Sequence, residues 1–143
     1  MLFSKEEESR ITAEIRQAER GTSGEIRMFV EDFCLRDHPV ERAAEVFQLF
    51  GMYNTAARNA VLVYLAEKSR NFAFWGDTGI HDRVGFQFWT IEKQLLRDYL
   101  QRDEAAEGLC QVIRQIGDKL RIYFPAVDDD TNDNELPDDI IYG

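Results

Sequence analysis

Residues 59–66 have the sequence NAVLVYLA, and this almost continuous apolar run decides the fold. A strand with one face in water alternates polar and apolar residues, whereas an unbroken apolar run is typical of a central strand covered on both faces. Residues 67–70, EKSR, form a polar stretch of hairpin length, and residues 71–75, NFAFW, return as an antiparallel strand. The segment therefore predicts the middle of a small sheet with helices on both sides.

Another strand precedes this run and is joined to it by a helix. In residues 25–31, EIRMFVE, the apolar side chains at alternate positions lie on one face, which is the period of a strand. Pro39 then opens an amphipathic stretch that ends near Phe50, and proline is tolerated in the first turn of a helix. A strand, a helix and a strand in this order predict a parallel pair with a right-handed crossover.

The sequence predicts further helices before and after the sheet. Ser4 followed by Glu7 is a capping box, which begins a helix that extends to about Glu19. The predicted class is therefore α/β, with a small mixed central sheet that consists of a parallel pair plus an antiparallel hairpin strand, flanked by helices.

The helical region that follows the hairpin is interrupted by loops. Residues 76–79, GDTG, end the strand, and we expect a short helical turn near residues 80–84 before a long helix over residues 88–99. Asp103 is expected to cap a last helix, which Pro125 ends.

The length and the charge distribution limit the classes of protein that the chain can represent. Its 143 residues fit one domain, which we assign to residues 1–125. Between residues 128 and 139 there are seven acids and no base, within a total formal charge of −10. We therefore expect residues 126–143 to form an acidic tail that is mobile or only loosely docked. Proteins that bind nucleic acid carry a basic patch, so this balance excludes such a role and is compatible with divalent cations or basic partners.

The sequence shows no sign of a membrane span or of a secretory signal. No stretch approaches the roughly 20 apolar residues that a membrane helix needs. The first residues, MLFSKEEE, lack a basic region followed by an apolar run. We expect a monomeric, cytoplasmic protein that could bind an unknown protein partner.

Several short sequences resemble those of the TPM domain family, the module of the thylakoid-lumen and photosystem-repair type. They are TSGEI at residues 22–26, RNAVLV at 58–63 and GDTGI at 76–80, in the order and spacing of that family. The ending, YFP at 123–125 and NELPDD at 134–139, is similar to that of its short soluble bacterial branch. The resemblance implies a Rossmann-like three-layer α/β sandwich and, as in several members, binding of calcium or other divalent ions.

The resemblance also implies roles that differ between branches of the family. Acid phosphatase activity is attributed to plant members of the thylakoid lumen, and animal members are membrane-tethered, receptor-associated proteins. This sequence departs from both because it shows no leader and no anchor, which leaves these two roles open.

The directions of the strands predict where polar residues meet. The start of the first strand, the start of the second and the end of the third lie at the same end of the sheet, which brings Glu25, Asn59 and Asp77 together. Carboxylate, amide and hydroxyl oxygens are the ligands of hard cations, so we expect calcium, with magnesium or zinc as alternatives. An alternative is that Glu25 and Asp77 are cap or turn residues and that Arg58 is a salt-bridge partner. The other residues expected at the site are Asp82 as a metal ligand, and Ser23, Arg58, Thr78, Gly79 and His81 as phosphate or ligand contacts.

Three functions follow from this site as hypotheses. The leading one is a divalent-cation-binding module with an accessory or protein-interaction role. The second is a metal-assisted acid phosphatase, in which Arg58 would clamp a phosphate, His81 would donate to it and a metal-bound water would attack. The sequence has no P-loop, nucleophile elbow or cysteine-x5-arginine loop that would favour another phosphatase mechanism. The third is a structural partner-binding domain without metal.

Three other features give weaker predictions. The opposite end of the sheet gathers Glu31, Asp32, Glu67 and Lys68, where we expect solvated charge, with a second cation site as the alternative. The acidic segment 128–135 partly resembles a calcium loop, but it lacks the glycine that such a loop needs and is expected to be solvated. The run 86–89, FQFW, has more aromatic rings than one buried helix face needs, so we expect one ring to be exposed.

Overall fold

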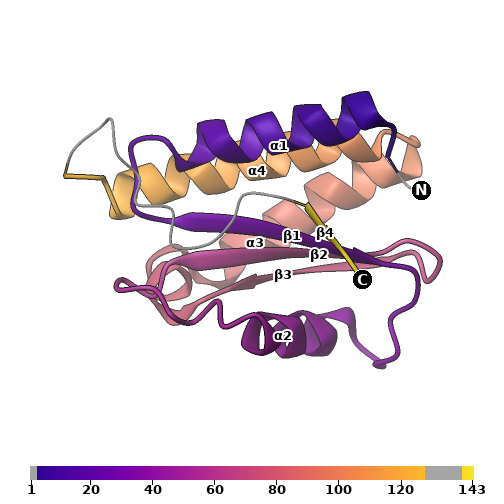
Figure 1. The fold of residues 1–143 in the computed structure, drawn as a ribbon, viewed down its shortest axis with the longest axis horizontal. Helices are drawn as coiled ribbons and strands as arrows, with labels where there is room; N and C mark the ends of the chain where they lie inside the picture. Colours follow the sequence, from indigo (N-terminus) through magenta and orange to yellow (C-terminus); the bar gives the residue numbers. More distant parts are fainter. Residues whose placement is uncertain (1–2, 128–139) are drawn as a thin grey trace.

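The computed structural model describes residues 3–127 and 140–143. Figure 1 shows the elements in chain order. They are α1 (Lys5–Glu19), β1 (Glu25–Glu31), α2 (Pro39–Leu49), β2 (Ala60–Ala66), β3 (Asn71–Gly76), α3 (Thr78–Gln101), α4 (Ala105–Tyr123) and β4 (Ile140–Tyr142).

The four strands form one mixed sheet in the order β3-β2-β1-β4. β1 runs parallel to β2, with Glu25 opposite Ala60, and β3 runs antiparallel to β2. The parallel pair and the hairpin strand that the sequence predicted are therefore confirmed.

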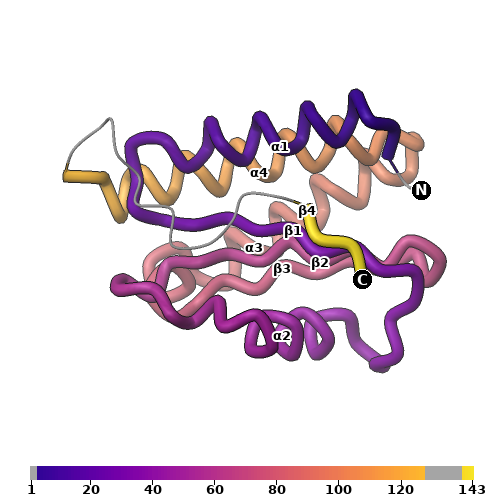
Figure 2. The backbone as a smooth tube through the Cα atoms, in the orientation of Figure 1, coloured from indigo at the N-terminus to yellow at the C-terminus, as the bar shows by residue number. Residues whose placement is uncertain are grey.

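β4 is a second parallel neighbour of β1 that the sequence analysis did not anticipate. Ile140 pairs with Met28 and Tyr142 pairs with Val30, and Figure 2 shows the end of the chain lying beside β1. Three residues are too few to show a strand period. The rest of the expected tail, residues 128–139, lies outside the described residues, as does the acidic segment 128–135.

The sheet is the middle of three layers, with α1, α3 and α4 on one face and α2 on the other (Figure 1). Side chains of β2 alternate between two cores: Val61 and Val63 pack with the three helices, whereas Leu62 and Tyr64 pack against α2. All seven residues of β2 are buried. The expected α/β three-layer sandwich is therefore confirmed, and the apolar run 59–66 is explained by burial on both faces.

The helix boundaries differ in detail from the predictions. The short turn and the long helix expected after β3 are joined into α3 across a kink at Gly85, where φ is 77° and ψ is 173°. Asp103, which was expected to cap α4, adopts a φ of 57°, and the N-cap residue is Glu104. The Asp103 N–H donates to the Leu100 carbonyl, so this residue follows Arg102, the C-cap of α3. Among the described residues, no helix is long and apolar enough to cross a membrane.

Candidate functional site

The three central residues of the predicted site lie at one end of the sheet. Glu25 begins β1, Asn59 precedes β2 and Asp77 follows β3. Backbone hydrogen bonds hold them in place, because the Glu25 N–H donates to the Asn59 carbonyl and the Asp77 N–H donates to the Ala60 carbonyl. All three residues are buried. Strand direction therefore predicted their convergence correctly.

Asp77 has strong protein partners at this end of the sheet. The Arg58 guanidinium donates to both carboxylate oxygens, Nε to Oδ2 at 2.6 Å and Nη2 to Oδ1 at 2.8 Å. The Thr78 N–H donates to Oδ1 at 2.8 Å, so Asp77 also caps α3. The hydrogen bond from Arg58 to Asp77 raises the pKa of the guanidinium. These contacts are those of the alternative interpretation, a capping residue with a salt-bridge partner.

The two partners differ in their access to solvent. The Arg58 side chain is 48% exposed, whereas that of Asp77 is 4% exposed. Arg58 also has a backbone φ of 54°, in the left-handed region that few residues other than glycine adopt. The negative charge is therefore fixed and buried, and its counter-charge approaches from the solvent side.

The neighbouring loops are tied to this end of the sheet by further contacts. Asn59 donates from its side-chain nitrogen to the Ser23 hydroxyl at 3.0 Å, and its N–H donates to the Thr55 hydroxyl at 3.3 Å. The Gly79 N–H donates to the Arg58 carbonyl at 2.8 Å. The start of α3 therefore packs closely against the loop before β2. This close approach leaves no room for a side chain at Gly79.

His81 and Asp82 lie on the first turns of α3 but differ in their surroundings. The His81 Nδ1 accepts a hydrogen bond from the Trp89 indole Nε1 at 3.1 Å, and the ring contacts Phe86 edge-on at 4.5 Å between centroids. Asp82 is exposed. Arg58, the residue expected to clamp a phosphate, is held by Asp77, so the phosphatase hypothesis gains no support from that contact.

The acids and histidines of the described part of the chain do not form a ready metal cluster. No group of three or more His, Cys, Asp or Glu side chains among these residues is arranged to hold an ion. A cation at this end of the sheet would therefore have the Glu25 and Asp77 carboxylates, with the remaining oxygens supplied by Asn59, the Ser23 hydroxyl and water.

The opposite end of the sheet neutralises its own charges. Arg42 donates to both oxygens of Glu31, at 2.8 and 3.0 Å, and the Tyr64 hydroxyl donates to the same carboxylate. Burial opposes ionisation of Glu31, but these hydrogen bonds outweigh it and lower the pKa. Asp32 pairs with Lys68 at 3.4 Å. The expected solvated charge describes Asp32, whose side chain is 58% exposed, but not Glu31, whose side chain is 14% exposed and is paired with Arg42.

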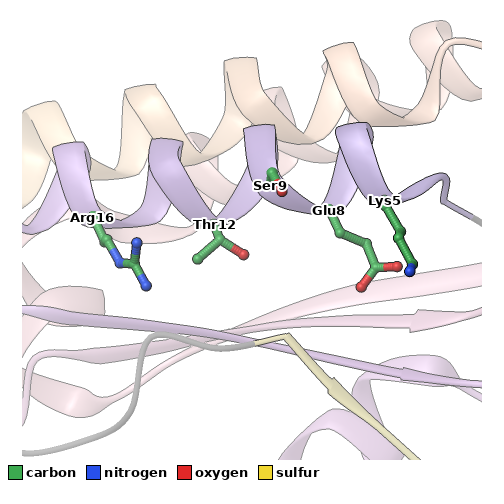
Figure 3. A pocket seen from close by; sticks show the side chains of 5 residues that line it. All are labelled: Lys5, Glu8, Ser9, Thr12 and Arg16. Atoms are coloured by element: carbon green, nitrogen blue, oxygen red, sulfur yellow. The ribbon is translucent and has the colours of Figure 1, made fainter.

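A polar hollow lies along α1, on the side that faces the strands (Figure 3). Its volume is about 420 Å³, and its walls carry both signs of charge. Burial and a hydrogen bond with Glu8 raise the pKa of Tyr142 to about 12, so α1 and β4 are linked at this hollow. The residues that line it are Lys5, Glu8, Ser9, Thr12 and Arg16.

An apolar pocket of about 320 Å³ lies next to the candidate site. It is formed by α2, β3 and α3, and Asp77 and Thr78 contribute to its wall. The exposed ring expected in the run 86–89 is Phe86, which is 78% exposed. Nothing in the sequence linked Val40 or Lys93 to this region, because they come from separate helices.

Glu92 is a buried carboxylate that the sequence analysis did not identify. It is 1% exposed, and burial raises its pKa to about 7, although Lys119 acts in the opposite direction. The signal was present in the spacing, because Glu92 lies four residues from both Phe88 and Leu96 on the apolar side of the helix.

A family model described as the TPM domain matches residues 1–119. The chain belongs to the TPM domain family. The predicted family membership is thereby confirmed. No curated protein matches the chain.

Solved structures agree with this assignment of the TPM fold. The BA42 protein from the psychrophilic bacterium Bizionia argentinensis is 37% identical, with a TM-score of 0.88 over 99% of this chain and 95% of that one. The N-terminal domain of cg2496 from Corynebacterium glutamicum is 16% identical, with a TM-score of 0.63 over 82% of this chain and 74% of that one. An N-terminal domain from P. gingivalis is 17% identical, with a TM-score of 0.64 over 83% and 76%. The last two show a common fold only.

Proposed function

We propose that this TPM domain is a divalent-cation-binding module with an accessory or protein-interaction role. Calcium is the expected ion, with magnesium or zinc as alternatives. The observation that supports the proposal is the pairing of a buried carboxylate, Asp77, with an exposed counter-charge, Arg58. A monomeric state and a cytoplasmic location remain accompanying predictions.

Exchange of counter-ions is the proposed mechanism. A buried carboxylate must be compensated by a cation or by hydrogen bonds. Arg58 supplies that charge from the solvent side, so it can leave without disturbing the core. A divalent ion would then bind Asp77 together with Glu25 and Asn59, which lie at the same end of the sheet. Asp82 stays a predicted outer ligand.

Loss of the Asp77 charge tests the site. In metal-stripped protein, calcium should shift the amide NMR signals near Glu25, Asn59 and Asp77, and Asp77→Asn should weaken binding at least about tenfold, because a hard cation prefers charged oxygen ligands. Asp32→Asn removes the same charge at the opposite end of the sheet, from a side chain that is 58% exposed. This control should bind calcium as the parent does.

Two results would count against the site at the end of the sheet. The first is a set of calcium-induced shifts confined to residues 128–139, and the second is equal weakening by Asp77→Asn and Asp32→Asn. Asp82→Asn, titrated in parallel, tests whether that exposed carboxylate takes part. An absence of shifts with calcium, magnesium and zinc would favour the partner-binding domain without metal.

Removal of the competing cation gives a second prediction. Arg58→Gln should strengthen calcium binding about fivefold, because the ion pair with Asp77 would no longer have to be broken on binding. Isothermal titration calorimetry of the variant and the parent measures this change. The paired variant Lys68→Gln removes a positive charge at the hairpin turn and should leave the affinity almost unchanged. Weaker binding by Arg58→Gln would show that Arg58 supports the site instead of competing for it.

A further inference from the structure

The apolar pocket beside β3 lies at the open edge of the sheet. β3 is the last strand in the order β3-β2-β1-β4, and within the described residues only β2 pairs with it. Its lining includes Val40 of α2, Trp75 of β3, and Phe86 and Trp89 of α3. Its volume, about 320 Å³, is within the range of roughly 300–1,000 Å³ that is usual for small-molecule sites.

Two glycines shape this pocket. Gly85 breaks α3 with backbone angles that only glycine adopts without strain, and the adjacent ring of Phe86 is left largely exposed. A Cβ atom on Gly76 would lie 2.5 Å from the Trp89 ring, so the missing side chain is what lets the indole lie against the end of β3. The aromatic walls are therefore set by the backbone.

The polar groups around the pocket favour an anion. The hydrogen bond from Trp89 to His81 Nδ1 places the proton of the neutral imidazole on Nε2, which makes that atom a donor. Lys93 follows Trp89 by one helical turn, and among the described residues it has no ion-pair partner. Asp77, the one carboxylate among the described residues of the wall, is already neutralised by Arg58.

We propose that this pocket binds a small aromatic carboxylate, with its rings between Trp75, Phe86 and Trp89 and its carboxylate on Lys93 and His81. Flat aromatic walls favour a flat apolar body, through edge and face contacts between rings. The ammonium of Lys93 and the N–H of His81 favour a negatively charged head group over a neutral or cationic one. This proposal does not depend on the cation site, because it assigns no role to Glu25 or Asn59.

The chain itself offers a specific reporter for the test. It has two tryptophans, and both line the pocket, so the two indole N–H signals of 15N-labelled protein report on this place alone. Titration in EDTA-containing buffer with 2-naphthoate should shift both signals. The neutral analogue 2-naphthylmethanol should shift them with an affinity about fivefold weaker. Equal affinities would contradict recognition of the carboxylate, and signals that do not move with either probe would contradict binding in this pocket.

Two exposed positions allow variants that keep the core intact. Lys93→Gln should weaken 2-naphthoate about fivefold and leave 2-naphthylmethanol unchanged, whereas Phe86→Ala should weaken both probes roughly equally. Lys68→Gln, which removes the same charge at the hairpin turn on the far end of the sheet, should change neither. An equal loss of 2-naphthoate affinity in Lys93→Gln and Lys68→Gln would show an effect of net charge alone. It would contradict the contact between Lys93 and the carboxylate of the ligand.

Discussion

Replacing Gly79 by alanine is expected to lower the free energy of unfolding by about 3 kcal/mol, because the new methyl group has no space. Its Cβ would overlap the Ala57 carbonyl oxygen and would lie 2.6 Å from the Arg58 carbonyl oxygen. Both are backbone atoms, so neither can rotate away as a side chain would. Relief requires the start of α3 to move, which would break the hydrogen bond from the Gly79 N–H to the Arg58 carbonyl.

Urea unfolding followed by circular dichroism measures this change, and Gly51→Ala is the matched control. Gly51 has a φ of 62°, and the nearest atom to a Cβ there is 3.5 Å away, at the Asn54 side chain. That variant suffers only the left-handed conformation, at about 1 kcal/mol. If both variants lose the same free energy, the close approach of α3 to the loop before β2 does not matter for stability.

The sequence was sufficient to predict the features that follow from hydrophobic periodicity and strand direction. The continuous apolar residues of 59–66 indicated burial on two faces, which requires three layers. Parallel and antiparallel directions then placed Glu25, Asn59 and Asp77 at one end of the sheet, as observed. These are properties of the chain path, and they follow without knowledge of any side-chain conformation.

Features that depend on pairwise geometry could not be predicted in the same way. Whether Asp77 would face a cation or Arg58 depends on the left-handed backbone of Arg58, and nothing in the residue type indicates that conformation. The apolar pocket depends on the kink at Gly85, which the sequence showed only as a break between helices. β4 has three residues, too few for a period, and it is held by its register with β1.

Glu92→Gln is expected to stabilise the protein above pH 7 by up to about 3 kcal/mol, with a gain that fades as the pH falls to about 4.5. Burial raises the pKa of Glu92 to about 7 from an ordinary value of 4.5. The folded state therefore binds this proton more tightly than the unfolded chain does. Between these two pH values the parent loses stability as the pH rises, because folding then leaves an ionised carboxylate out of water. Glutamine has a similar shape and no charge, so the variant lacks this contribution.

Gln115 and Lys119 determine how much of the free-energy cost of burying the ionised Glu92 carboxylate remains. The Gln115 amide, with its nitrogen turned toward Glu92, donates to both carboxylate oxygens at 2.5 and 3.0 Å, which favours the ionised form. With its oxygen turned toward Glu92, the same amide accepts a hydrogen bond from the O–H of the neutral acid. Gln115 can therefore form hydrogen bonds with both protonation states of Glu92. Because Gln115 and Lys119 both favour the ionised form, about 3 kcal/mol is an upper bound for the stabilisation by Glu92→Gln.

The measurement is the difference in unfolding free energy between Glu92→Gln and the parent from pH 4.5 to 8. Using the difference removes the pH dependence of all other groups, which the two proteins share. Asp98→Asn removes a charge from an exposed position on the same helix and should give a small difference that does not vary with pH. A flat difference for Glu92→Gln would mean that Gln115 and Lys119 offset the burial completely. A difference that rises with pH would show that ionisation of Glu92, buried where α3 packs on α4, destabilises the folded protein.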